Sequence, residues 1–156
     1  MSKKITDWHK LEEAVTDFLR ARQRQTESYF HRFYDTRSAG SSLPPQPSDF
    51  LFIHRGRAHF IEAKFSQKNH SLSSCFAANV DPGQLASAHL VHRARADYYF
   101  LFYSLDANLF EVWGGEYCYS RYREHLRLEK NKCKRFETLE SAILGGILNG
   151  HRSSVQ

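Results

Sequence analysis

The sequence predicts a mixed α/β fold in one domain, and three observations support this. Of its 156 residues, 41% are hydrophobic and 14% are aromatic, which is typical of a chain that folds around a core. An apolar stripe at helical spacing comes first, and short runs rich in aromatic and β-branched residues follow. A second helical stretch then separates two groups of strand-like runs, as in a strand–helix–strand crossover. We expect a single domain over residues 1–156.

The first element is predicted to be a helix that begins after Asp7, a favourable N-cap, and runs to about Arg24. Its buried stripe consists of apolar residues at helical spacing: Trp8, Leu11, Val15, Phe18 and Leu19. Aromatic residues indicate a strand over Ser28–Tyr34. The segment Ser38–Pro47 is rich in Ser, Gly and Pro and is predicted to be a loop.

Two short apolar strands are predicted next, over Phe50–His54 and Ala58–Phe65. The basic tripeptide Arg55-Gly56-Arg57 separates them, and its glycine favours a compact hairpin turn. The segment Gln67–Asn79 is polar, and we expect it to be irregular.

The second half of the chain is predicted to contain two helices and two strands. Asp81-Pro82-Gly83 is typical of a helix start, and this helix runs to about Arg95. The apolar run Tyr98–Ser104 indicates a strand covered on both faces. A further strand over Leu109–Trp113 precedes a last helix, Leu139–Leu148, which Thr138 would cap.

Charge and cysteine content restrict the kinds of partner. The chain has 22 Lys and Arg against 17 Asp and Glu, a formal charge of +5, which favours a polyanionic partner. Its three cysteines are widely spaced without a CxxC pair, so we expect reduced thiols rather than a zinc site or disulfide scaffold. We find no signal-peptide core and no run of membrane-spanning length. We therefore expect a cytoplasmic protein without a membrane partner.

The strongest candidate for chemistry is Asp49 with Glu62 and Lys64. Residues two apart on a strand share a face, so Glu62 and Lys64 point the same way, and hairpin pairing would bring Asp49 beside Glu62. Unpartnered carboxylates repel each other, and a divalent metal relieves that cost. A metal ion together with a lysine suits phosphodiester cleavage. The alternative is a salt bridge on a surface strand.

Two further residues are candidates for the same site. Glu12 lies at the edge of the first helix's apolar stripe, and helical phase favours it over Glu13 as the residue that faces the site. Gln84 lies in the first turn of the crossover helix, from which it could reach a metal-bound water or DNA. Ordinary solvent-exposed polar roles remain the alternative for both.

These residues resemble the PD-(D/E)xK nuclease superfamily and, within it, the RecU-like Holliday junction resolvases. The resemblance covers roughly Lys10–Trp113 and rests on several short motifs in the family's order. They are Leu11-Glu12-Glu13-Ala14-Val15, Asp49 opening a strand, Arg55-Gly56-Arg57, Ile61-Glu62-Ala63-Lys64, Gln84-Leu85 and the apolar strand Tyr98–Ser104.

The resemblance implies a restriction-endonuclease-like core: a helix, a three-strand meander, a crossover helix and further strands, here followed by a C-terminal helix. It also implies a homodimeric, Mg²⁺-dependent endonuclease acting on branched DNA, with Mn²⁺ as a possible substitute. Asp49 and Glu62 would bind the metal, and Glu12 would be a further or water-mediated ligand. Lys64 would orient the attacking water and stabilise charge on the phosphate, and Gln84 would complete the site.

DNA contacts and dimerisation are further expectations. The candidate phosphate-binding residues are basic and lie near predicted loops or helix ends: Arg37, Arg55, Arg57, Lys68, Arg93 and Arg95. A dimer interface is expected on the aromatic surface of Tyr98–Trp113 or on the C-terminal helix. Such a protein would associate with the nucleoid. The alternatives are a non-catalytic DNA-binding module on the same fold and a restriction or repair nuclease on unbranched DNA.

Overall fold

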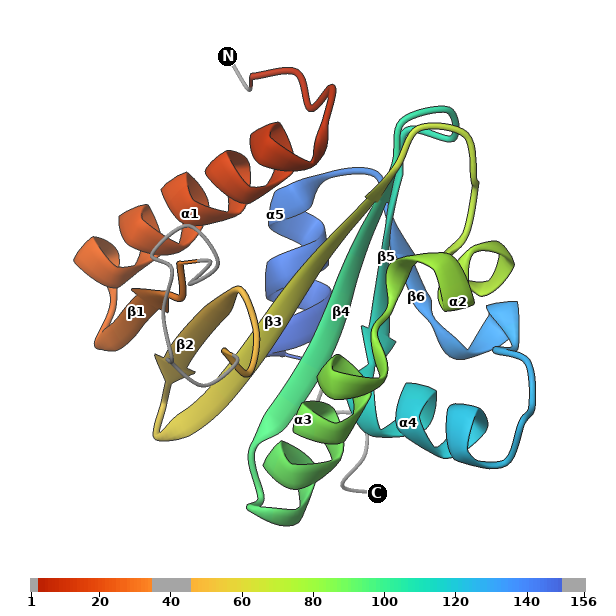
Figure 1. Cartoon of the computed structure of the whole chain (residues 1–156). Coiled ribbons are helices and arrows are strands. Elements are labelled where there is room, and N and C mark those ends of the chain that lie inside the picture. The colour runs from red at the N-terminus through yellow and green to blue at the C-terminus, as the bar shows by residue number, and fades with distance from the viewer. Residues whose placement is uncertain (1–2, 35–45, 150–156) are drawn as a thin grey trace.

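A mixed sheet organises the computed structural model, which describes residues 3–34 and 46–149. Within these ranges the sheet has six strands in the order of the chain (Figure 1). Strands β3 and β4 pair in parallel, and each of the other neighbouring pairs is antiparallel. The strands are β1 (Ser28–Arg32), β2 (Phe50–His54), β3 (Arg57–Ser66), β4 (Asp97–Ser104), β5 (Leu109–Gly114) and β6 (Lys134–Phe136).

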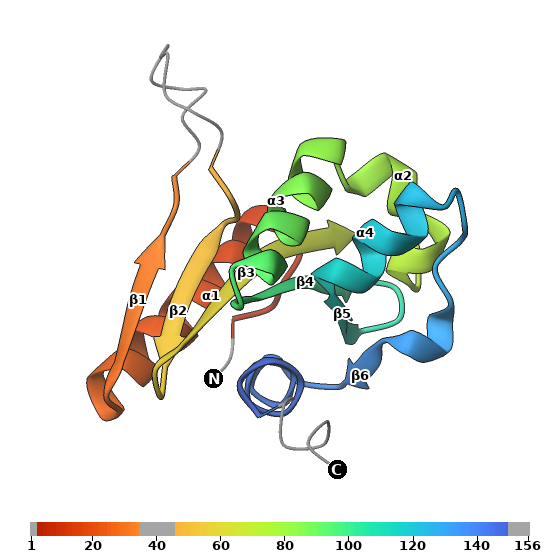
Figure 2. The ribbon, with the colours of Figure 1, turned by 90° about the horizontal axis from the view of Figure 1, so that it is seen from below.

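Helices cover both faces of the sheet. The longer ones are α1 (Trp8–Gln25), α3 (Pro82–Arg93), α4 (Gly115–Arg123) and the C-terminal helix, which is α5 (Leu139–Ser141) continued by π-helical turns over Ala142–Leu148. Figure 2 shows α3 and α4 on one side of the sheet and the C-terminal helix on the other. No helix in the described ranges is both long and apolar enough to cross a membrane.

Two buried clusters hold these layers together. On one face, Leu11, Val15 and Leu19 of α1 pack with residues of the sheet and of the C-terminal helix. On the other face, Leu85 and Ala88 of α3 belong to a cluster that includes the strand aromatics Tyr98, Phe100, Phe102 and Trp113. The central strands are therefore covered on both sides, which explains their nearly continuous apolar sequence.

The β2–β3 hairpin sets the register of the candidate site. His54 pairs with Arg57, so Arg55 and Gly56 form a two-residue turn with φ values of 51° and 73°. Both residues at the centre of such a turn need positive φ, and glycine adopts it at no steric cost. Because Phe50 pairs with Ile61, the next positions along the two strands are Asp49 and Glu62.

The structure confirms the predicted order of the main elements and two of the helix caps. The Asp7 side chain accepts a hydrogen bond from the Lys10 backbone N–H at 2.9 Å. The Thr138 hydroxyl likewise accepts one from the Ser141 backbone N–H at 3.1 Å.

Two expectations were wrong, and three further elements were not predicted. The segment Gln67–Asn79 is not wholly irregular, because it contains a 3₁₀ turn, Leu72–Ser74, and the short helix α2, Phe76–Asn79. Helix α4, a second 3₁₀ turn and β6 were not predicted. The aromatics of Tyr98–Trp113 do not form a surface for dimerisation, because most of them are buried within this one chain.

Candidate functional site

Asp49 directly precedes β2, and it lies beside Glu62 on the neighbouring strand β3, in the middle of the sheet. An Asp49 carboxylate oxygen, Oδ2, accepts a hydrogen bond from the Ala63 backbone N–H at 2.8 Å. This bond ties the residue before β2 to the residue after Glu62. Glu62 is 6% exposed, so its carboxylate is almost completely removed from water. The predicted proximity of the two carboxylates is therefore observed.

Lys64 and Gln84 both contact Glu62. The Lys64 Nζ atom lies 3.4 Å from Glu62 Oε1, with both side chains largely buried. Gln84, in the first turn of α3, donates a hydrogen bond from Nε2 to the same oxygen at 2.7 Å. The parallel β3–β4 pair requires a crossover, and α3 provides it, so the helix start is brought beside the centre of β3.

The electrostatics of the pair favour protonation in the absence of a cation. Burial, and next to it the charge of Asp49, raises the pKa of Glu62 from 4.5 to about 8, although Lys64 opposes this shift. Burial also raises the pKa of Asp49, against the opposing effects of the Ala63 hydrogen bond and the charges of Lys64 and Arg32. Two carboxyl groups in such a setting bind either protons or cations.

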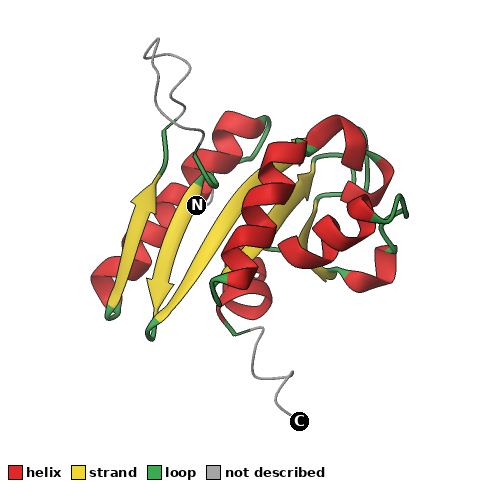
Figure 3. Cartoon of the chain, turned by 60° about the horizontal axis from the view of Figure 1, so that its bottom comes forward, coloured by secondary structure: helices red, strands yellow, loops and turns green. Residues whose placement is uncertain are grey.

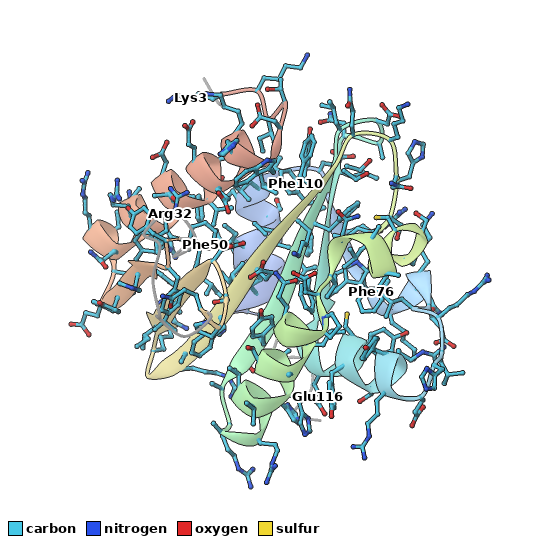
Figure 4. The ribbon with its side chains drawn as sticks, viewed as in Figure 1. Lys3, Arg32, Phe50, Phe76, Phe110 and Glu116 are labelled. Carbon is cyan, nitrogen blue, oxygen red and sulfur yellow. The ribbon has the colours of Figure 1, made fainter. Side chains whose placement is uncertain are left out.

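Glu12 approaches this centre from α1, and Arg32 of β1 holds it. Arg32 Nη2 lies 3.3 Å from Glu12 Oε2, and the charge of Glu12 contributes to the raised pKa of Glu62. In antiparallel register, Arg32 pairs with Phe50, next to Asp49. Arg32 and Phe50, the first residue of β2, lie side by side in Figure 4.

Two residues beside the carboxylates, Arg32 and Tyr98, were not predicted. The hydroxyl of Tyr98 donates to the backbone carbonyl of Pro47 at 2.8 Å. Its pKa is raised by burial and by the charges of Glu62 and Asp49. The sequence signal for Arg32 is its place one strand before Asp49, but using it requires the β1–β2 register.

A divalent cation fits the chemistry of the Asp49–Glu62 pair. Both side chains offer carboxylate oxygens, the donors that Mg²⁺ prefers, and burial raises the pKa of both. In the described part of the chain, no group of three or more His, Cys, Asp or Glu side chains is arranged to hold a metal. The role of Glu12 as a further or water-mediated ligand stays a prediction, and its Oε2 lies 3.3 Å from Arg32 Nη2.

Four of the predicted DNA-contacting residues lie at the ends of their elements opposite the candidate site. Arg55 and Arg57 lie at the end of β2 opposite Asp49, and the Arg57 guanidinium pairs with Asp97. Arg93 and Arg95 lie at the end of α3 opposite Gln84. The remaining two are Lys68, which is exposed just after β3, and Arg37, which lies outside the described residues.

Comparisons with known proteins give little beyond a distant likeness in structure. No family model matches the chain, and no curated protein matches its sequence. Eight chains among solved structures match. One is the Holliday junction resolvase Hjc of Archaeoglobus fulgidus, with 11% identity and a TM-score of 0.43 over 66% of this chain and 75% of that one. This identity and TM-score are too low to establish a shared activity, so the proposals below rest on the side chains of the site.

Proposed function

We propose that this protein is a metal-dependent endonuclease that hydrolyses phosphodiester bonds in DNA. The observation that carries the proposal is the pair formed by the half-buried Asp49 and the buried Glu62, with the Lys64 ammonium 3.4 Å from Glu62. A protein gains no stability from burying two adjacent carboxylates, since each loses hydration and they repel each other. Such an arrangement is useful where a cation must be held against a phosphate.

Each side chain has a separate role in this proposal. Asp49 and Glu62 would hold the Mg²⁺, or Mn²⁺ in its place, and the ion would supply Lewis-acid activation of water and charge compensation at the phosphate. Lys64, 13% exposed, would direct its ammonium at the phosphate and stabilise the charge that develops there. Gln84 would keep the Glu62 carboxylate in one orientation through its hydrogen bond.

The substrate class in this proposal is branched DNA, such as a four-way junction. Its support is the sequence resemblance, together with the basic composition of the chain, a formal charge of +5.

Symmetric cutting of a junction requires two active sites, so the active form would be a homodimer. Light scattering over a dilution series should show a dimer at concentrations where cleavage occurs. We favour this proposal over a non-catalytic DNA-binding module, because such a module would place two carboxylates where they repel the phosphate.

The direct test is cleavage of linear, nicked, flapped and four-way-junction DNA, with Mg²⁺ and with EDTA. We compare wild type, Asp49→Asn and the matched control Asp106→Asn, which changes an exposed residue of the β4–β5 turn. Symmetric nicking of the junction by wild type and by the control, lost in Asp49→Asn and in EDTA, is the expected result. Cutting of flaps or linear DNA would reject the branched substrate but keep the nuclease.

A second test does not depend on activity. A cation that binds the folded protein raises its melting temperature as the cation concentration increases. Millimolar Mg²⁺ should therefore raise the melting temperature of wild type and of Asp106→Asn, but not that of Asp49→Asn. Equal shifts in all three proteins, or no shift in any, would mean that Asp49 does not contribute to a metal site.

A further inference from the structure

A basic cleft lies beside the candidate catalytic pair, between the last turns of α1 and the edge strand β1. Its volume is about 390 Å³, and its lining includes Arg20, Arg24 and Arg32. Figure 3 shows β1 as the outermost strand, with α1 behind it. Gln23 Oε1 accepts a hydrogen bond from the Phe30 backbone N–H at 2.6 Å, which fastens the helix to the strand. The cleft therefore lies between two elements that a hydrogen bond holds together.

Two of the positive charges in this cleft, on Arg20 and Arg24, have no ion-pair partner among the described residues. Arg20 and Arg24 are exposed and one helical turn apart, a spacing at which like charges destabilise a helix. Among the described residues that line the cleft, none is acidic, and neither of these two arginines forms an ion pair with another described residue. Favourable interaction with the helix dipole accounts for Arg24 in the last turn of α1 but not for Arg20.

Arg32 connects the cleft to the carboxylate pair. Its guanidinium borders the cleft, contacts Glu12 Oε2 at 3.3 Å, and lowers the pKa of Asp49 against the effect of burial. The ring of Tyr34 lies 5.2 Å from the guanidinium carbon and is 67% exposed, so it supports Arg32 from the solvent side. An anionic strand lying in the cleft would therefore pass Arg32, whose charge acts on Asp49.

We propose that this cleft binds the backbone phosphates of the DNA strand next to the cleaved bond, with Arg20 and Arg24 as the main contacts. The inference rests on the proposed nuclease function and names a surface that the sequence reasoning did not. The arginines match the phosphodiester backbone because a guanidinium binds two phosphate oxygens at once. The cleft would thus set the path of the strand into the site.

The test is the salt dependence of DNA binding, measured in EDTA so that cleavage does not interfere. The variant Arg20→Gln/Arg24→Gln removes both charges with little change in helix propensity. Its control, Lys4→Gln/Arg127→Gln, removes the same charge at exposed residues outside the cleft. Arg32 is left intact because it also contacts Glu12. Circular dichroism and melting temperature establish that each variant is folded.

The slope to compare is that of the logarithm of the binding constant against the logarithm of the salt concentration. On duplex DNA each lost phosphate contact reduces the magnitude of this slope by about 0.9, so the cleft variant should lose about 1.8. The control should keep nearly the wild-type slope. Equal losses in both variants would indicate a general charge effect and overturn the proposal, as would an unchanged slope in the cleft variant. Wild type that binds but never cuts, with the slope reduced only in the cleft variant, would refute the nuclease and keep the cleft. Wild type that cuts DNA, with the cleft variant binding as wild type does, would keep the nuclease and refute the cleft. Wild type that does not bind DNA would refute both proposals.

Discussion

Gln84 Nε2 donates to Glu62 Oε1 at 2.7 Å, although the two residues lie on different elements, α3 and β3. The other end of the same amide is also fixed, because Gln84 Oε1 accepts a hydrogen bond from the Asp81 backbone N–H at 3.0 Å. With its oxygen committed to the helix cap, the amide must present its NH₂ group to Glu62. The start of the crossover helix therefore orients a carboxylate in the centre of the sheet.

Replacing Gln84 with alanine should reduce cleavage without unfolding the protein. Removing a group that orients a ligand typically costs about 10- to 100-fold in metal affinity or activity. We expect a higher Mg²⁺ concentration for half-maximal cleavage and a lower kcat. Ser87→Ala, on the same helix, is the matched control. Wild-type kinetics in Gln84→Ala would mean that the hydrogen bond only caps α3.

The raised pKa of Glu62 makes a prediction about stability in EDTA. Because the folded-state pKa is about 8 against an ordinary value of 4.5, the folded protein binds more protons between these pH values than the unfolded chain. Stability is then lost as the pH rises through this window. Glu62→Gln cannot ionise, so its melting temperature should exceed that of wild type increasingly from pH 5 to pH 9.

The corresponding difference in the free energy of unfolding should be on the order of a few kcal/mol at pH 9. Glu62→Gln should at the same time lose cleavage, so the two properties would change in opposite directions. A melting-temperature difference that stays constant over the pH range would show that Glu62 titrates normally in the fold. Glu137→Gln, an exposed residue directly after β6, controls for the removal of a surface carboxylate.

Lys64→Gln should impair chemistry more than DNA binding. The ammonium is positioned next to Glu62, and a donor that stabilises transition-state charge contributes about 10²- to 10³-fold to the rate. Single-turnover cleavage with saturating protein should fall by about this factor, while the dissociation constant for DNA changes little. Lys130→Gln removes an exposed lysine and should leave both quantities unchanged. A large loss of binding in Lys64→Gln would assign Lys64 to DNA binding instead.

The sequence predicted the β2–β3 hairpin well because its determinants are local. Alternation of side chains along β3 and the Arg55-Gly56 turn are sufficient to bring Asp49 next to Glu62. Gln84 was also found from local signals, since the Asp81-Pro82 helix start fixes its place in the first turn. The roles assigned to these residues remain predictions.

What the sequence did not reveal depends on contacts between distant segments. Arg32 contacts Glu12 only because β1 pairs with β2 and packs under α1, and no local pattern encodes that pairing. Helix α4 begins at a glycine, Gly115, where a Cβ would lie 2.9 Å from the Tyr98 carbonyl, so close packing rather than helix propensity selects this residue. Strand β6 is only three residues long, Lys134–Phe136, too short for a periodic signal.

A second buried carboxylate, Glu111 on β5, makes the last prediction, which concerns stability alone. It is fully buried and accepts hydrogen bonds from the Leu72 backbone N–H at 2.8 Å and from Trp113 Nε1 at 3.0 Å. It also pairs with Arg135, whose Nη2 lies 3.0 Å from Glu111 Oε2. Unlike Glu62, this carboxylate has its charge and its hydrogen-bonding capacity satisfied by the chain itself.

Glu111→Ala should therefore destabilise the fold, because it leaves buried donors without an acceptor. The cost should be about 3 kcal/mol or more, measured as a lower urea midpoint with an unchanged m-value. Cleavage by the fraction that remains folded at low temperature should match wild type, since Glu111 does not contact Asp49, Glu62 or Lys64. Loss of activity without loss of stability would instead connect Glu111 to the site, and wild-type stability would show that water replaces the carboxylate.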